Sequence, residues 1–151
     1  MVRILIADDH QVVRMALAQV ICESEADWEI VGEAGDGREA VELARSLKPD
    51  LAVLDFAMPL VDGIKAGREI RAVLPGARIL VYTFMIFPAI ERMSKDAGIH
   101  AVVQKADSPA LIAEIRRVLA LKPALGVEPA ADSLGALKDY SSKRFPRPGG
   151  C

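Results

Sequence analysis

Residues 4–10, ILIADDH, place two adjacent carboxylates directly after four apolar residues. A short apolar run of this kind is typical of a strand that is covered on both faces of a parallel sheet. Burying a carboxylate is costly unless a compensating charge or hydrogen bond meets it. We therefore expect Asp8 and Asp9 at the end of a buried strand, beside a partner that offsets their negative charge.

The same kind of apolar run recurs four more times along the chain, with amphipathic helical patterns between the runs. The run at 28–34 alternates apolar and polar residues, which favours an edge strand. This alternation predicts an α/β fold, a doubly wound (βα)5 sandwich around a five-stranded parallel sheet with right-handed crossovers. We expect strands at 3–8, 28–34, 50–55, 78–83 and 100–105, and helices near 11–23, 37–47, 63–73, 86–96 and 109–121.

Two helix starts carry capping signals. Asp36 is expected to cap the second helix, with Glu39 three residues later as its capping-box partner. Ser108 followed by Pro109 indicates an N-cap and a first helical residue for the last helix.

The composition favours one globular domain and excludes several classes of protein. The 151 residues are 52% hydrophobic and carry a formal net charge of −2, which gives no electrostatic footprint for nucleic acid or an anionic membrane. The apolar runs are too short to span a bilayer, and the N-terminus lacks the features of a signal peptide. We therefore expect a cytoplasmic protein with no membrane partner.

The helical and strand patterns end near residue 121. We expect a domain at 1–121 and a flexible tail or linker at 122–151, which is rich in Pro, Gly, Ser and Ala. The tail lacks the amphipathic helices of a DNA-binding domain, so direct contact with nucleic acid is not expected.

Polar residues end four of the five expected strands: Asp8 and Asp9, then Asp55, Thr83 and Lys105. Because parallel strands bring their carboxyl ends to one edge of a sheet, these side chains should lie together. Three carboxylates at close range favour a bound cation, and oxygen ligands with room for water suit Mg²⁺. Asp55 is the candidate nucleophile for an aspartyl-phosphate, and Lys105 and Thr83 could hold phosphoryl oxygens.

Each of these residues also has an ordinary structural interpretation. Asp8 and Asp9 could be solvated acids at a helix start, Asp55 a turn former, Thr83 a strand residue and Lys105 a surface amine. Their common position at strand ends on one side of the sheet favours a site over five independent coincidences.

The ordered combination of the DD pair, D-x-x-MP-x-x-DG at 55–63, the threonine and the lysine resembles a response-regulator receiver domain of two-component signalling. The resemblance covers residues 2 to about 121, is closest to receivers that precede a LuxR-type helix-turn-helix domain, and implies a CheY-like, flavodoxin-like fold. Further matching stretches are VGEAGDGREAVELARSLKPDLAVLDFAMPLVDGIKAGREIR and ARILVYT.

The resemblance implies a phosphoacceptor role for Asp55, which would receive its phosphoryl group from a histidine kinase, a phosphotransfer protein or a small phosphodonor. Thr83 and Lys105 would bind the phosphoryl oxygens, and a downstream protein target would read the resulting conformational change. The implied Mg²⁺ ligands are Asp8, Asp9, Asp55 and the backbone carbonyl of Ala57.

Two positions depart from the family pattern. Val102 stands where family members commonly carry an aromatic switch residue, and Phe84 follows Thr83 where a small residue is usual. We interpret Phe84, Ile86 and Phe87 as an exposed interaction surface for a partner or for a homodimer. The alternative is an ordinary helix start packed on the core.

These residues bear on three possible functions. The leading interpretation is a phosphoacceptor signalling domain and not an enzyme. The alternative is an atypical, phosphorylation-independent receiver that acts as a protein-protein interaction module, which the altered switch region favours. A phosphohydrolase of the haloacid dehalogenase type needs a second aspartate two residues beyond the nucleophile, where this chain has Ala57.

Overall fold

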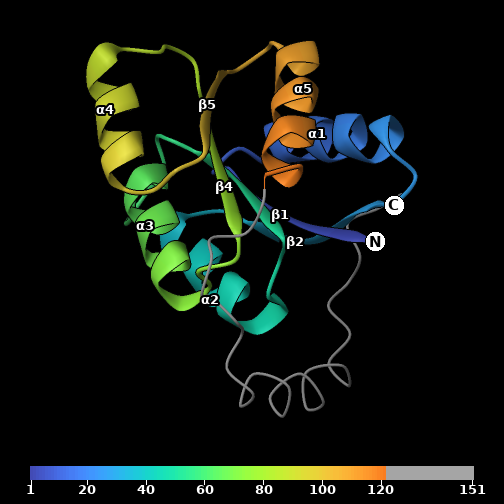
Figure 1. Ribbon diagram of the computed structural model, residues 1–151, viewed down its shortest axis with the longest axis horizontal. Coiled ribbons are helices and arrows are strands. Elements are labelled where there is room, and N and C mark those ends of the chain that lie inside the picture. Colours follow the sequence, from blue (N-terminus) through green and yellow to red (C-terminus); the bar gives the residue numbers. More distant parts are fainter. Residues whose placement is uncertain (122–151) are drawn as a thin grey trace.

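The computed structural model describes residues 1–121, so the tail expected at 122–151 lies outside the described residues. Strands and helices alternate throughout, and all neighbouring strands pair in parallel in the order β2-β1-β3-β4-β5 (Figure 1). This confirms the predicted (βα)5 fold. The elements are β1 (Val2–Ala7), α1 (Gln11–Ser24), β2 (Trp28–Ala34), α2 (Gly37–Leu47), β3 (Leu51–Asp55), α3 (Gly63–Val73), β4 (Arg78–Thr83), α4 (Pro88–Asp96), β5 (Ala101–Gln104) and α5 (Ser108–Leu119).

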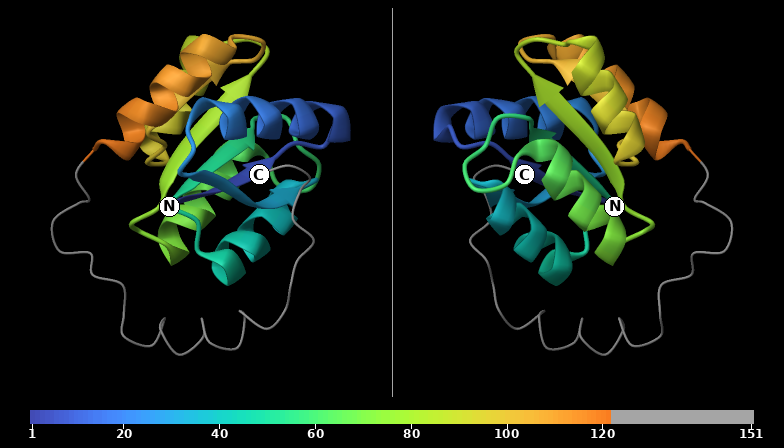
Figure 2. Two further views of the ribbon diagram at one scale, coloured as in Figure 1. Left: turned by 90° about the vertical axis from the view of Figure 1, so that its right-hand side faces the viewer. Right: turned by 90° about the vertical axis from the view of Figure 1, so that its left-hand side faces the viewer.

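The helices form two layers, one on each face of the sheet (Figures 1 and 2). Helices α1 and α5 pack on one face and α2, α3 and α4 on the other. The residues of β1 alternate between these layers: Ile4 and Ile6 belong to the α1/α5 core, whereas Leu5 and Ala7 belong to the opposite core. All four side chains are fully buried, which explains why this strand is apolar at every position. Among the described helices, none has the length and apolar character needed to cross a bilayer.

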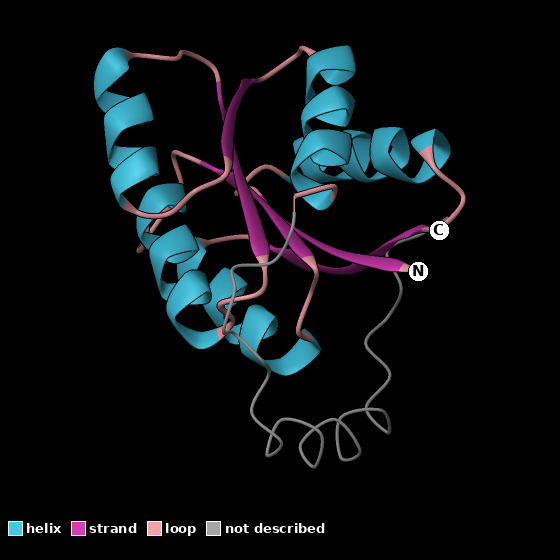
Figure 3. Ribbon diagram, in the orientation of Figure 1, coloured by secondary structure: helices cyan, strands magenta, loops and turns pink. Residues whose placement is uncertain are grey.

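The sheet register sets which side chains meet at the carboxyl edge. β2 is an edge strand, as its alternating sequence predicts, and β3 lies at the centre. Ala7 pairs with Leu54, Asp55 with Tyr82 and Thr83 with Gln104. The loops that follow β4 and β5 consequently lie at the same end of the sheet (Figure 3).

The helix starts confirm one capping prediction and correct another. Asp36 caps α2 by accepting a hydrogen bond from the Glu39 amide, although the Glu39 side chain accepts from the Gly35 amide and not from Asp36 itself. The N-cap of α5 is Asp107, not Ser108, because the Asp107 carboxylate accepts from the Ala110 amide and starts the helix one residue earlier. The fourth helix begins at Pro88 instead of residue 86.

His100 directly precedes β5, at the opposite end of the sheet from those loops, and its amide donates a hydrogen bond to the Ile79 carbonyl of β4. Its Nδ1 accepts a hydrogen bond from the Ile79 amide at 3.0 Å, and its Nε2 lies 3.0 Å from Arg71 Nη1. Burial lowers the pKa of His100, and the positive charges of Arg71 and Arg78 lower it further.

We expect the free energy of unfolding to fall as the pH is lowered through and below 6.5, the ordinary pKa of histidine. In that range the unfolded chain binds a proton at His100 that the folded chain does not yet bind, so acid favours unfolding. Urea unfolding at about pH 7 and about pH 5.5 measures this loss. In the His100→Gln variant the loss should shrink, and an unchanged loss would contradict the assignment to His100.

Candidate functional site

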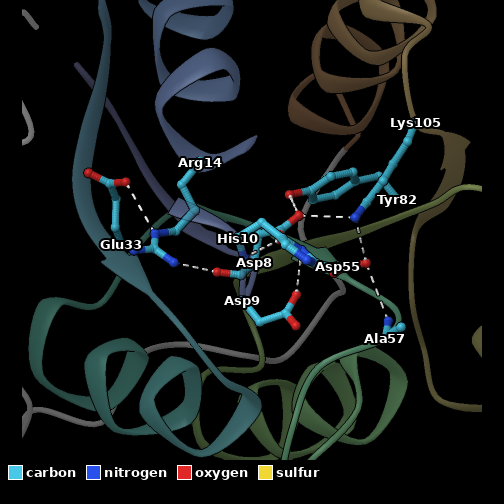
Figure 4. Close-up of polar contacts among 9 residues, drawn as sticks. All are labelled: Asp8, Asp9, His10, Arg14, Glu33, Asp55, Ala57, Tyr82 and Lys105. Atoms are coloured by element: carbon cyan, nitrogen blue, oxygen red, sulfur yellow. Dashed lines mark hydrogen bonds and ion pairs between the residues drawn. The ribbon is translucent and has the colours of Figure 1, made fainter. Parts of the chain in front are cut away.

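Asp8, Asp55 and Lys105 meet at the carboxyl edge of the sheet, each from a different strand end or the residue beyond it (Figure 4). The Lys105 ammonium lies 3.0 Å from Asp8 Oδ2 and 3.0 Å from Asp55 Oδ1. The Lys105 side chain is only 6% exposed, so one buried cation is shared by two buried carboxylates. The strand-end residues predicted to converge therefore do so at these three positions.

Asp8 is the most heavily hydrogen-bonded acid of the site. Its Oδ1 accepts from the His10 amide at 2.8 Å and lies 3.3 Å from His10 Nδ1. Its Oδ2 accepts from the Tyr82 hydroxyl at 2.7 Å and from Lys105. Burial acts to raise the pKa of Asp8, but the hydrogen bonds from His10, Tyr82 and Lys105 outweigh it and hold the pKa below its ordinary value.

Asp55 ends the central strand and is 3% exposed. Its Oδ1 accepts from the Ala57 amide at 3.3 Å and pairs with Lys105. Burial raises the pKa of Asp55, the negative charge of Asp8 adds to this effect, and Lys105 only partly offsets it. The Oδ2 atom of Asp55 makes no hydrogen bond or ion pair with a described residue. This oxygen is therefore not kept from a reacting group.

Asp9 and His10 extend the acidic site towards solvent. The Asp9 side chain is 30% exposed, and its Oδ1 lies 3.0 Å from His10 Nδ1. His10 is the N-cap residue of α1 and makes no side-chain capping hydrogen bond. Asp8, Asp9 and His10 offer ligand atoms within 4.8 Å of one another. Together with Asp55 this donor set is dominated by carboxylate oxygens, and the three acids outnumber the one lysine, so the site fits Mg²⁺.

A pocket of about 230 Å³ opens beside these acids. Thr83 lines it and is 7% exposed, and its Oγ1 donates to the Met85 carbonyl at 3.3 Å. Thr83 therefore lies at the site as predicted, with its hydroxyl engaged by the loop between β4 and α4. Other lining residues include Asp55, Ala57, Phe84, Phe87 and Lys105.

Phe84 connects that loop to the end of β5. Its ring centroid lies 4.6 Å from the Lys105 ammonium, and its carbonyl accepts from Gln104 Nε2 at 3.3 Å. The side chain is nevertheless 67% exposed. Val102, at the altered switch position, packs partly buried against the core of the α2–α4 face and makes no comparable link to the site.

Two residues near the site were not predicted. Tyr82 contacts Asp8 through its hydroxyl, and Arg14 donates to the Asp8 carbonyl at 2.6 Å while pairing with Glu33 at 3.5 Å. A buried tyrosine normally needs a hydrogen-bond partner for its hydroxyl. A tyrosine in an apolar strand, directly before Thr83, is therefore a sequence signal from which Tyr82 could have been identified. The fold places Arg14 one helical turn beyond His10.

Gly63, the first residue of α3, packs directly on the backbone of Asp55. A Cβ at this position would lie 2.1 Å from the Asp55 carbonyl oxygen. We expect Gly63→Ala to lower the free energy of unfolding by about 3 kcal/mol, since the clash is with backbone and not with a flexible side chain. Chemical denaturation measures this. Gly76→Ala is the matched control because a Cβ there meets nothing within 4 Å, and equal losses in both variants would contradict the close packing.

Comparison with known proteins gives the family. The family model for the response regulator receiver domain matches residues 4–116. The transcriptional regulatory protein LiaR of Bacillus subtilis (strain 168) is 36% identical over 152 aligned positions, covering 97% of this chain and 69% of that protein. The transcriptional regulatory protein PdtaR of Mycobacterium tuberculosis is 45% identical over 103 residues, covering 68% of this chain and 49% of that protein. The chain thus spans about half the length of PdtaR.

Solved structures agree with this family match. The response regulator domain of Thermotoga maritima CheB superimposes with a TM-score of 0.74 at 30% identity, covering 82% of this chain and 99% of that one. A LuxR-family two-component response regulator from Aurantimonas sp. SI85-9A1 gives a TM-score of 0.75 at 31% identity, with coverage of 93% and 98%. The chain belongs to the response regulator receiver domain family.

Proposed function

We propose that Asp55 accepts a phosphoryl group from the phosphohistidine of a histidine kinase or phosphotransfer protein. The observation that carries this proposal is the buried Asp55 carboxylate, fixed through Oδ1 by Lys105 and the Ala57 amide inside a pocket that also contains Thr83. Phosphoryl transfer depends mainly on positioning and on neutralising charge, and both are available here.

The geometry suggests how the transfer proceeds. Asp55 Oδ2, which is not held by the contacts on Oδ1, attacks the phosphorus atom while the bond to the donor's nitrogen breaks. Lys105 lies close enough to Asp55 to pair with a phosphoryl oxygen. Mg²⁺, when held by Asp8, Asp9, Asp55 and the Ala57 carbonyl, would supply further positive charge for the transferring group. The product is an aspartyl-phosphate on a domain that acts as phosphoacceptor, not as an enzyme.

The experiment that tests this function is phosphorylation of the purified chain by a small phosphodonor such as acetyl phosphate, followed by intact mass. One added phosphoryl group is expected with Mg²⁺ present, and none after Mg²⁺ is removed with a chelator. An unmodified mass under both conditions would favour the alternative of a phosphorylation-independent interaction module.

The loop between β4 and α4 is proposed as the surface that a downstream target or a second copy of the chain recognises. Phe84, Ile86 and Phe87 are 67%, 38% and 48% exposed, and Met85 between them is 58% exposed. Consecutive large apolar side chains in solvent are typical of interaction sites. The interpretation of these residues as a buried helix start does not fit this exposure.

Thr83 is the proposed link between the pocket and this surface. In the unphosphorylated protein its hydroxyl donates to the Met85 carbonyl. If the hydroxyl donated to a phosphoryl oxygen instead, the loop between β4 and α4 would lose this hydrogen bond. We expect amide hydrogen exchange within 84–90 to change on phosphorylation, while exchange in α2 stays the same. Equal exchange in both forms would contradict a switch at this loop and favour the phosphorylation-independent alternative.

A further inference from the structure

The imidazole ring of His100 lies between two hydrogen-bond donors, at the end of the sheet opposite the candidate site. Its Nδ1 accepts from the Ile79 amide at 3.0 Å, and its Nε2 lies 3.0 Å from Nη1 of Arg71 on α3. Turning the ring over would place a carbon atom opposite the Ile79 amide. This amide therefore fixes Nδ1 as the accepting nitrogen of the ring.

The proton of the neutral ring consequently faces Arg71. A neutral imidazole carries its single proton on the nitrogen that does not accept, which here is Nε2, and a guanidinium group has donors but no acceptor. Protonating Nδ1 as well would only oppose a second pair of donors, at the Ile79 amide. Among residues 1–121 no acceptor lies within hydrogen-bond distance of His100 Nε2. Two donors thus face each other at 3.0 Å without an oxygen between them.

Positive charge also exceeds negative charge around this ring. Arg71, Arg78 and Arg117 all lie close enough to lower the pKa of His100. Arg117 is paired with the carboxylate of Glu114. By contrast, the Arg78 guanidinium donates to backbone carbonyls, and within residues 1–121 neither Arg71 nor Arg78 pairs with a carboxylate. Two guanidinium charges are therefore left without a described counter-charge.

We propose that His100 and Arg71 form a binding site for a phosphate group, free or carried as a monoester. One phosphate oxygen would accept from His100 Nε2 and Arg71 Nη1 together, so that the two opposed donors share one charged acceptor. A phosphate group carries up to two negative charges near neutral pH, which matches the unpaired charges of Arg71 and Arg78 better than one carboxylate does. The site lies at the far end of the sheet from Asp55 and is independent of its phosphorylation.

Nuclear magnetic resonance of the full chain tests this site in Mg²⁺-free buffer at about pH 7.5, where a phosphate group is mostly dianionic. Inorganic phosphate is titrated in, with sodium chloride at equal ionic strength as the comparison. We expect saturable shifts of the His100 ring resonances and of the Ile79 amide with phosphate alone. The ring of His10, the other histidine of the chain, is the internal reference and should not saturate.

Arg71→Gln removes the guanidinium that would share the phosphate oxygen. Since a hydrogen bond to a charged group contributes about 1.5–3 kcal/mol, the Kd for phosphate should rise by at least about tenfold. Arg68→Gln is the matched control, because it removes the same charge from an exposed position one turn earlier on α3 and should leave the Kd nearly unchanged. Glycerol 3-phosphate tests the source: tighter binding than inorganic phosphate supports a monoester ligand, and equal binding supports free phosphate.

Three results would overturn the proposal. The first is the absence of a saturable His100 shift in the wild-type titration, which decides the site even if Arg71→Gln were unstable. The second is an equal loss of binding in Arg68→Gln and Arg71→Gln, which would assign the effect to the general charge of α3. The third is equal or tighter saturation by acetate, which would make the ligand a carboxylate. None of these results bears on phosphoryl transfer to Asp55.

Discussion

We expect replacement of Lys105 by methionine to lower the free energy of unfolding in Mg²⁺-free buffer by about 3 kcal/mol. The Lys105 ammonium is the cation shared by Asp8 and Asp55, at 3.0 Å from each, and its side chain is 6% exposed. Methionine fills the same space without the charge, which leaves two buried carboxylates facing each other. Removing one member of a buried ion pair costs more than the pair itself contributes, because the remaining charge is uncompensated.

Urea unfolding measures this loss, with Lys65→Met as the matched control, because Lys65 is exposed on α3 and its replacement should change little. Mg²⁺ should restore part of the stability of Lys105→Met, since a divalent cation at the acids replaces the missing positive charge. A Lys105→Met protein as stable as the control would mean that the acids tolerate one another without the lysine.

Asp55→Asn should abolish uptake of a phosphoryl group from a small phosphodonor. The amide has nearly the shape of the carboxylate but lacks a nucleophilic oxygen anion, so the pocket stays formed while the reaction stops. Intact mass after incubation with donor and Mg²⁺ measures the loss. Asp96→Asn is the control, because Asp96 is an exposed acid at the end of α4 and should leave uptake at the wild-type level.

If Asp55→Asn were still fully phosphorylated, the phosphoacceptor would have to be another residue of the acidic site. Loss of uptake in both Asp55→Asn and Asp96→Asn would point to damage to the fold instead. Only a loss confined to Asp55→Asn agrees with the proposed role.

Most of the fold could be predicted from the sequence because its elements are strongly patterned. Five apolar runs with helices between them leave few alternatives to a parallel sheet, and parallel strands necessarily bring their ends together. The approach of Asp8, Asp55 and Lys105 therefore followed from their positions at strand ends, without any knowledge of distances. The match to the receiver-domain family model confirms the family resemblance that these residues indicate.

Side-chain partners across the sheet could not be predicted in the same way. The Tyr82 bond to Asp8 joins residues 74 positions apart, and it depends on strand order and register together. His100 likewise depends on Arg71 of α3 and Ile79 of β4, which only tertiary packing brings to it. The N-cap of α5 was misplaced by one residue because Asp107 and Ser108 are both good capping residues, and local sequence does not choose between them.

Locating the phosphoryl group in the wild-type protein tests the central claim most directly. After phosphorylation with Mg²⁺, borohydride reduction converts an aspartyl-phosphate to homoserine, and peptide mapping by mass spectrometry finds the converted residue. The account predicts conversion at Asp55 alone. Conversion at Asp8 or Asp9, or at no aspartate, would contradict it.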